Sequence, residues 1–158
     1  MRLSVLCVGR PGRLLADAVA EYERRARRYW TLDVVEIRAE PARRGRPDAE
    51  IRARESRRLL ERVPEGADVV ALTRSGERWS SEQFSRYLEG LAVASQPGAA
   101  FLIGGALGLD SPTLAHARVR LSLSPFTLAH DIARLVLMEQ LYRAGTIVRG
   151  EPYHKGRG

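Results

Sequence analysis

The sequence predicts an α/β protein whose mainly parallel sheet has five to six strands and carries helices on both faces. Short apolar, strand-like runs alternate five times with longer segments of helical periodicity. The connections between successive runs are long enough for the crossovers that parallel strands need. The chain shows no internal repeat and no linker, so residues 1–158 are expected to form a single domain.

The strands are expected where short apolar runs stand between breaking residues. Residues 3–8 are almost wholly apolar, which is typical of a strand buried on both faces. The remaining strands are predicted over residues 31–37, 68–73, 99–103 and 119–123. Gly9-Arg10-Pro11-Gly12 ends the first strand, and Ser75-Gly76 is expected to form a turn after the third.

The helices are expected at residues 14–26, 48–62, 80–93, a short segment beginning at Ser111-Pro112, and a last segment that follows residues 124–130 and runs to about Thr146. Asp48 is predicted to be an N-cap, and Ser80 and Gln83 have the spacing of a capping box. Ser111 is predicted to be an N-cap that precedes Pro112 at the first helical position.

The last helix is apolar over a wider arc than one sheet contact requires. Such a helix is either central to the core or part of an oligomer interface, and we favour the interface. Its two acids, Asp131 and Glu139, are interpreted as ion-pair partners of Arg134 and Arg143.

The charge of the chain favours a polyanionic partner. Lys and Arg number 26 against 19 Asp and Glu, which gives a net charge of +7. Nucleic acid is favoured over a membrane surface because no basic amphipathic anchor is evident. All but one of these cations are arginine, so a bias towards GC-rich codons is an alternative explanation.

Several classes of protein are excluded by composition. No apolar run approaches the roughly 18 residues of a membrane span, and the N-terminal apolar run is too short for a signal peptide. The single cysteine, Cys7, allows neither an intramolecular disulfide nor a cysteine-based zinc site, and it fits a reducing cytosol. No clustered histidine and carboxylate spacing suggests a metal.

Ligands of open α/β sheets bind at the carboxyl ends of the strands, which directs attention to three segments. The first is Leu72-Thr73. The second is the glycine cluster 104–108, which is either a ligand-binding loop or a tight strand–helix turn. The third, residues 121–128, is apolar with hydroxyls and a proline; it suits a flat aromatic ligand such as adenine, or it is a hydrophobic connector under the last helix.

Few side chains are obvious catalysts. His154 lies in a polar tail where no neighbour in sequence would bury it, so the residues alone favour a solvated side chain. Ser124 lacks the GxSxG elbow of a serine hydrolase. Cys7 lies in a buried strand and is interpreted as inert core.

Four segments together resemble one family. They are Phe101-Leu102-Ile103-Gly104-Gly105-Ala106-Leu107-Gly108, Leu123-Ser124-Pro125-Phe126-Thr127-Leu128-Ala129-His130, Glu139-Gln140-Leu141-Tyr142-Arg143-Ala144 and Gly150-Glu151-Pro152-Tyr153-His154-Lys155. In this order they resemble the ribosomal RNA large subunit methyltransferase H family, which belongs to the knotted SPOUT methyltransferases. The resemblance spans essentially the whole chain.

The resemblance implies a small cytoplasmic enzyme that transfers a methyl group from S-adenosylmethionine to N3 of a pseudouridine in 23S rRNA. The substrate it implies is the stem-loop at the subunit interface of the assembled ribosome. It also implies a homodimer and a C-terminal trefoil knot, against the general rule that knots are nearly absent from proteins.

The resemblance also implies roles for individual residues. The cofactor contacts carry over to Leu72, Gly104, Gly105, Leu123, Ser124, Pro125, Phe126, Thr127 and Leu128. The candidate catalytic residues are His154, Tyr153 and Arg143. His154 would accept the N3 proton, Arg143 would stabilise the developing anion or grip a phosphate, and the tail would reach the partner subunit's site.

Two alternatives stay open. One is a non-catalytic protein of the same fold that binds RNA on the ribosome. The other is a SPOUT methyltransferase that acts on tRNA. The chain has no room for an appended RNA-binding domain, so we favour the ribosome, which offers a large surface to a minimal enzyme.

Overall fold

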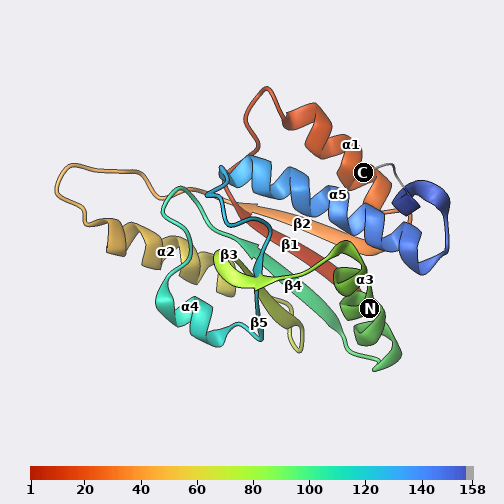
Figure 1. The fold of residues 1–158 in the computed structure, drawn as a ribbon. Coiled ribbons are helices and arrows are strands. Elements are labelled where there is room, and N and C mark those ends of the chain that lie inside the picture. The colour runs from red at the N-terminus through yellow and green to blue at the C-terminus, as the bar shows by residue number, and fades with distance from the viewer. Residues whose placement is uncertain (156–158) are drawn as a thin grey trace.

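The computed structural model describes residues 1–155, and its core is one parallel sheet of five strands. The strands are β1 (Arg2–Val8), β2 (Thr31–Ile37), β3 (Asp68–Arg78), β4 (Gly98–Ile103) and β5 (Val119–Ser122). They lie in the order β2-β1-β4-β3-β5, and every neighbouring pair is parallel (Figure 1). The predicted α/β class and parallel sheet are confirmed, whereas the knot stays a prediction.

Helices cover both faces of the sheet, as predicted. They are α1 (Ala16–Ala26), α2 (Asp48–Leu60), α3 (Ser81–Val93), α4 (Ser111–His116), α5 (His130–Val148) and the 3-10 helix η1 (Pro152–Lys155). One core packs α1, α3 and α5 against side chains such as Val5 and Phe101, and the other packs α2 against Leu6 and Leu102. Figure 1 shows α5 running beside α1 across the first of these faces.

The strand β1 explains why the sheet has two cores. Its interior side chains alternate between the faces, so Val5 joins one core and Leu6 the other. Cys7 is 2% exposed, and burial raises the pKa of its thiol to about 12. The thiol therefore stays protonated at neutral pH, which agrees with its interpretation as inert core.

Helix α5 lies centrally in its layer, between α1 and α3. The predicted ion pair of Glu139 with Arg143 is present at 2.6 Å, but the predicted pair of Asp131 with Arg134 is wrong. Asp131 accepts a hydrogen bond from the backbone N–H of Gly12, while the buried Arg134 pairs with Glu36 and Glu23. The wide apolar arc thus serves the core, and the oligomer interface stays a prediction.

Two predicted N-caps are wrong by one residue, and one is confirmed. The N-cap of α2 is Pro47 and that of α4 is Asp110, whose side chain accepts from the N–H of Thr113. Asp48 and Ser111 instead begin their helices. The capping box of Ser80 with Gln83 is present, because both reciprocal hydrogen bonds form.

The turn predicted at Ser75-Gly76 is also wrong, because β3 continues through it to Arg78. Leu72 and Glu77 both pair with Leu121 of β5, so the residues between them bulge out of the ladder. Gly76 is required there, since an ideal Cβ would lie 2.6 Å from the backbone of Arg120. The bulge places Thr73 and Arg74 at the carboxyl edge of the sheet, where a cavity lies.

Among residues 1–155, no helix is both long enough and apolar enough to cross a bilayer. Within the same range, no group of three histidine, cysteine or acidic side chains is placed to hold a metal ion.

The contact of β4 with β1 generates a prediction at Gly98. An ideal Cβ there would lie 1.7 Å from the carbonyl oxygen of Arg2. We expect Gly98→Ala to destabilise the protein by about 3 kcal/mol, because two backbones would have to separate. Urea unfolding measures the change.

Gly90→Ala is the matched control, since Gly90 lies within α3 with no atom in the way of a Cβ. It is expected to be neutral or to stabilise by up to about 1 kcal/mol. Equal stabilities of the two variants would contradict the account of the β1–β4 contact.

Candidate active site

A cavity of about 630 Å³ opens at the carboxyl ends of β4 and β5 and beside the bulge of β3. Its wall is built from residues 72–74, 103–109, 123–124 and 126–129, together with Arg52 of α2 and His130 and Ala133 of α5. The three segments that the sequence predicted to meet line one pocket, but Leu72 and Thr73 lie at a bulge within β3 and not at the end of that strand.

The glycine turn 104–108 forms one wall of the cavity and carries side chains only at Ala106 and Leu107. The N–H of Gly108 donates to the carbonyl of Gly105, and Gly108 has a φ of 74°, which favours glycine. An ideal Cβ on Gly104 would lie 2.7 Å from the backbone of Gly108. The turn can close this tightly because position 104 carries no side chain, so main chain contributes to this wall.

One face of α2 holds this turn from behind. Arg52 Nε donates to the carbonyl of Leu107 at 2.9 Å, and Ser56 Oγ accepts from the N–H of Asp110 at 3.0 Å. Glu55, only 4% exposed, packs behind Gly105, where an ideal Cβ would lie 2.9 Å from its Oε1. These residues are three or four positions apart and therefore share a face of the helix.

The loop 123–128 is fixed by its own hydroxyls. The N–H of Phe126 donates to Ser124 Oγ at 3.0 Å, and Arg74 donates to Thr127 Oγ1 at 3.2 Å. Ser122 Oγ lies 3.0 Å from the carbonyl oxygens of both Arg74 and Ser124. These contacts tie the loop after β5 to the bulge of β3, so the two walls hold each other in place.

The charged side chains that line the cavity are all positive. Arg52 and Arg74 line the cavity, and no acidic side chain of residues 1–155 does. The remainder of the lining is main chain, small hydroxyls, apolar side chains and the imidazole of His130. Such a surface suits a ligand with a flat apolar part and an anionic group.

The predicted cofactor contacts gather at this cavity with one exception. Leu72, Gly104, Gly105, Leu123, Ser124, Phe126, Thr127 and Leu128 line it, and Pro125 does not. Their role as cofactor contacts stays a prediction. Sequence reasoning missed Arg52 and Arg74, because nothing local distinguishes them from the many other arginines.

A second cluster forms where η1 packs on the end of α5. Glu139 is its centre, since its Oε1 accepts from Arg143 and from the Tyr153 hydroxyl at 3.1 Å. The ring of Tyr153 packs against that of Tyr142, with centroids 4.5 Å apart. Burial raises the pKa of Tyr153 above its ordinary value, and Tyr22 and Glu139 add to the effect, so the phenol stays protonated at neutral pH.

His154 is placed differently from the expectation of a solvated tail. Its side chain is half-buried, and Nδ1 is inaccessible without a hydrogen-bond partner among residues 1–155. The expectation was wrong because η1 folds back onto α5, a contact that no neighbouring residue in the sequence reveals. An unpartnered buried nitrogen is unusual enough to mark a functional candidate.

The two clusters lie apart within one chain. None of His154, Tyr153 and Arg143 lines the cavity. Arg143 follows the cavity-lining Ala133 by ten residues of α5. At about 1.5 Å per residue, that separation is about 15 Å along the helix axis. The chain alone therefore does not bring the predicted catalytic residues to the predicted cofactor contacts.

This chain is similar to known proteins over almost its whole length. Residues 1–154 match the family described as "Predicted SPOUT methyltransferase". The ribosomal RNA large subunit methyltransferase H of Gemmatimonas aurantiaca is 49% identical over 98% of this chain and 100% of its own. The enzyme of the same name from Syntrophotalea carbinolica is 45% identical over 98% of this chain and 99% of its own.

A solved structure shares the fold. The crystal structure of a probable methyltransferase from Bordetella pertussis Tohama I superposes with a TM-score of 0.56 and 15% identity. The superposition covers 90% of this chain and 95% of the Bordetella pertussis chain.

The C-terminal cluster yields a prediction at Glu139. We expect Glu139→Ala to release the tail, because the variant lacks the acceptor of both Arg143 and Tyr153. Hydrogen bonds to a charged group contribute about 1.5–3 kcal/mol, so tryptic cleavage at Arg149 should accelerate roughly tenfold or more.

The control is Glu89→Ala, since Glu89 is exposed on α3 and makes no ion pair within residues 1–155. Its cleavage rate should equal that of the wild type. A Glu139 variant cleaved no faster than this control would show that the tail does not depend on the cluster.

Proposed function

Because this chain belongs to the SPOUT methyltransferase family, we propose that it methylates N3 of a pseudouridine in 23S rRNA, with S-adenosylmethionine as methyl donor. The protein is a methyltransferase, and its full-length relatives are named for large-subunit ribosomal RNA. We further propose that the assembled ribosome is the substrate and the cytoplasm the location.

The cavity is the observation that carries this proposal. Its volume of about 630 Å³ lies in the range of ligand pockets, roughly 300–1,000 Å³. The main chain of the glycine turn and the fixed loop 123–128 offer hydrogen-bonding groups and apolar surface for an adenosine. The guanidinium groups of Arg52 and Arg74 suit the carboxylate of the methionine part. The residues present therefore fit S-adenosylmethionine.

When bound, S-adenosylmethionine supplies an electrophilic methyl group on a sulfonium. The protein's contribution is mainly to position the reactants, because the methyl group is already activated. The glycine turn and loop 123–128 would bind and orient the cofactor. Their mutual ties, through Arg74 and Ser122 on one side and α2 on the other, keep the pocket in shape.

The target N3–H is weakly acidic and must lose its proton, which requires a base. We assign this role to His154, since imidazole is the commonest general base in enzymes. Arg143 would stabilise the developing anion, as a guanidinium does for phosphate or enolate oxygens. Tyr153 stays protonated, so it would donate a hydrogen bond and orient the tail.

We propose a homodimer in which the tail of one subunit completes the cavity of the other. The separation of the two clusters within one chain supports this arrangement. Exposed apolar side chains near the cavity support it too, because Phe126 is 79% and Ile132 42% exposed. A second subunit that covers them would bury apolar surface and bring both clusters together.

The proposed activity is tested by methyl transfer. Ribosomes that lack the modification are incubated with the enzyme and methyl-labelled S-adenosylmethionine, and the labelled nucleoside is mapped. We expect label on N3 of one pseudouridine of 23S rRNA. Label in tRNA but not in ribosomes would favour the tRNA enzyme, and binding of the cofactor without transfer would indicate a non-catalytic protein.

The assignment of the base is tested by His154→Ala. We expect kcat to fall by roughly 100-fold or more, as is typical for loss of a general base, while cofactor affinity stays within twofold. Calorimetry and steady-state methylation measure the two quantities.

The control for this variant is His116→Ala, since His116 is exposed on α4. It should retain full activity. Activity of the His154 variant within twofold of the wild type would remove His154 from the mechanism.

A further inference from the structure

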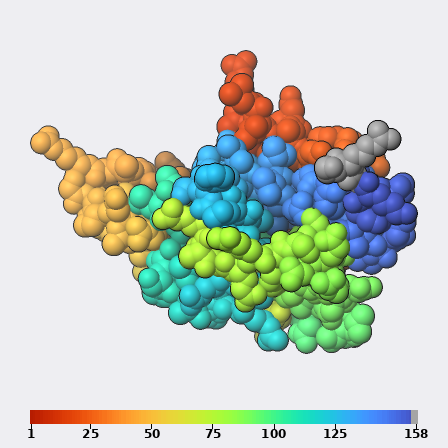
Figure 2. Space-filling view, in the orientation of Figure 1, coloured from red at the N-terminus to blue at the C-terminus, as the bar shows by residue number. Residues whose placement is uncertain are grey.

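A basic segment extends beside the cavity and contributes one residue, Arg52, to its lining. It consists of residues 38–62, namely the loop after β2 followed by α2 and its end, and is called the arginine lobe here. The lobe contains nine arginines against five aspartates and glutamates, so it carries +4 of the chain's net +7. Figure 2 shows the loop and α2 projecting from one end of the molecule.

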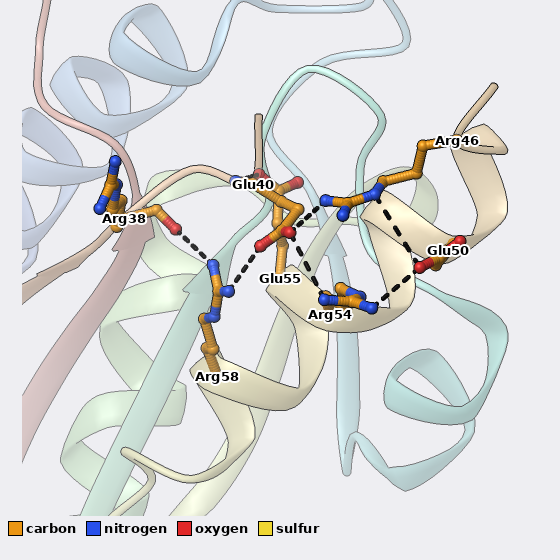
Figure 3. A network of polar contacts seen from close by, with 7 residues as sticks. All are labelled: Arg38, Glu40, Arg46, Glu50, Arg54, Glu55 and Arg58. Carbon is orange, nitrogen blue, oxygen red and sulfur yellow. Dashed lines mark hydrogen bonds and ion pairs between the residues drawn. The ribbon is translucent and has the colours of Figure 1, made fainter. Parts of the chain in front are cut away.

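Ion pairs fasten the loop of the lobe to α2. Glu40, with a side chain 6% exposed, contacts the guanidinium groups of Arg46, Arg54 and Arg58 (Figure 3). Arg58 also donates to the carbonyl of Arg38 at 3.1 Å. Burial would raise the pKa of the Glu40 carboxyl, but the Arg58 hydrogen bond and the three cations outweigh it and lower the pKa. Glu40 therefore stays ionised at neutral pH and holds three like charges together.

Four other arginines of the lobe, called the outer arginines here, form no ion pair with Glu40. Arg38, Arg43, Arg44 and Arg57 are exposed. Within residues 1–155, the structure gives none of the four an ion pair or a side-chain hydrogen bond. The exposed acids nearby are Asp48 and Glu61, which leave an excess of positive charge. The fastened loop thus presents unpaired guanidinium groups from a fixed backbone.

The lobe is joined to the cavity through α2. The helix holds the glycine turn with Arg52 and Ser56, and Arg52 itself lines the cavity. The basic surface of the lobe therefore reaches the rim of the proposed cofactor site. A polyanion bound along the lobe would lie beside the place where the target base must enter.

We propose that the outer arginines of the arginine lobe, Arg38, Arg43, Arg44 and Arg57, form a docking surface for the phosphate backbone of RNA, outside the proposed cofactor cavity. The inference rests on the proposed function, which supplies an RNA substrate. Guanidinium groups bind phosphates through paired N–H donors, and unpaired ones lose no internal partner when they do so.

Side-chain composition favours RNA over a protein partner. The loop 38–47 contains only arginine, glutamate, alanine, proline and glycine. It offers no aromatic or large aliphatic anchor, which a protein interface needs at its centre. It also has no ring on which a base could stack, so the contact should be with the backbone and depend strongly on salt.

The test compares two double variants that remove equal charge. Arg43→Gln/Arg44→Gln alters the lobe. Arg28→Gln/Arg86→Gln is the matched control, with both residues exposed and without an ion pair in residues 1–155. Arg86 lies on α3, at the other end of the molecule from α2 (Figure 1).

Binding is measured to purified large ribosomal subunits and to a protein-free 23S rRNA transcript, each over a series of KCl concentrations. We expect the lobe variant to lose about tenfold in affinity for both, and its salt slope to fall by about one to two. The control should stay within twofold of the wild type. Calorimetry with S-adenosylmethionine should give wild-type affinity for both variants, which shows that the cavity is intact.

Equal binding by the two variants would overturn the proposal. So would weaker binding to subunits with unchanged binding to the transcript, because the partner would then be a ribosomal protein. The readout is binding rather than methyl transfer. A lobe variant that binds RNA normally would therefore not contradict the proposed methyltransferase activity. Conversely, the binding result can be interpreted even if no methyl group is transferred to pseudouridine.

Discussion

The parallel pairing of β4 with β1 and β3 is the constraint on which the rest of the molecule depends. All six residues of β4 are buried, and its start lies so close to β1 that only glycine fits at position 98. Parallel strands bring their carboxyl ends to one edge, so β4 and β5 end beside the bulge of β3. The glycine turn forms at this edge, where Gly104 lies too close to the backbone of Gly108 for a side chain. Main chain of the turn therefore contributes to the wall of the cavity.

Helix α2 contacts the wall of the cavity with one face and carries arginines of the lobe on the opposite face. Its inner face contacts the glycine turn through Arg52, Glu55 and Ser56, and its outer face carries the arginines of the lobe. The helix is amphipathic, since Ile51 and Leu59 are buried, and the ion pairs of Arg54 and Arg58 with Glu40 add a polar attachment to the loop before it. A single element thus links the proposed RNA-binding surface to the proposed cofactor site.

Patterns of neighbouring residues predicted most of the residues that line the cavity, but they did not predict the bulge of β3 or the burial of His154. The capping box at Ser80 was predictable because both partners lie within one turn. The bulge after Leu72 was not, since Ser75-Gly76 has the composition of a turn and only the neighbouring strand β5 keeps it extended. The burial of His154 was not predictable for the same reason, since it depends on η1 folding back onto α5.

The sequence by itself determined the order of strands and helices, the burial of the sheet on both faces and the three segments that end at its carboxyl edge. These follow from periodicity and from glycine and proline positions, which act over a few residues. The tertiary structure alone decided which of the many arginines line the cavity, and that the candidate catalytic residues lie apart from the candidate cofactor contacts within one chain. Such contacts join residues far apart in sequence, as Arg52 and Leu107 are, and no local pattern encodes them.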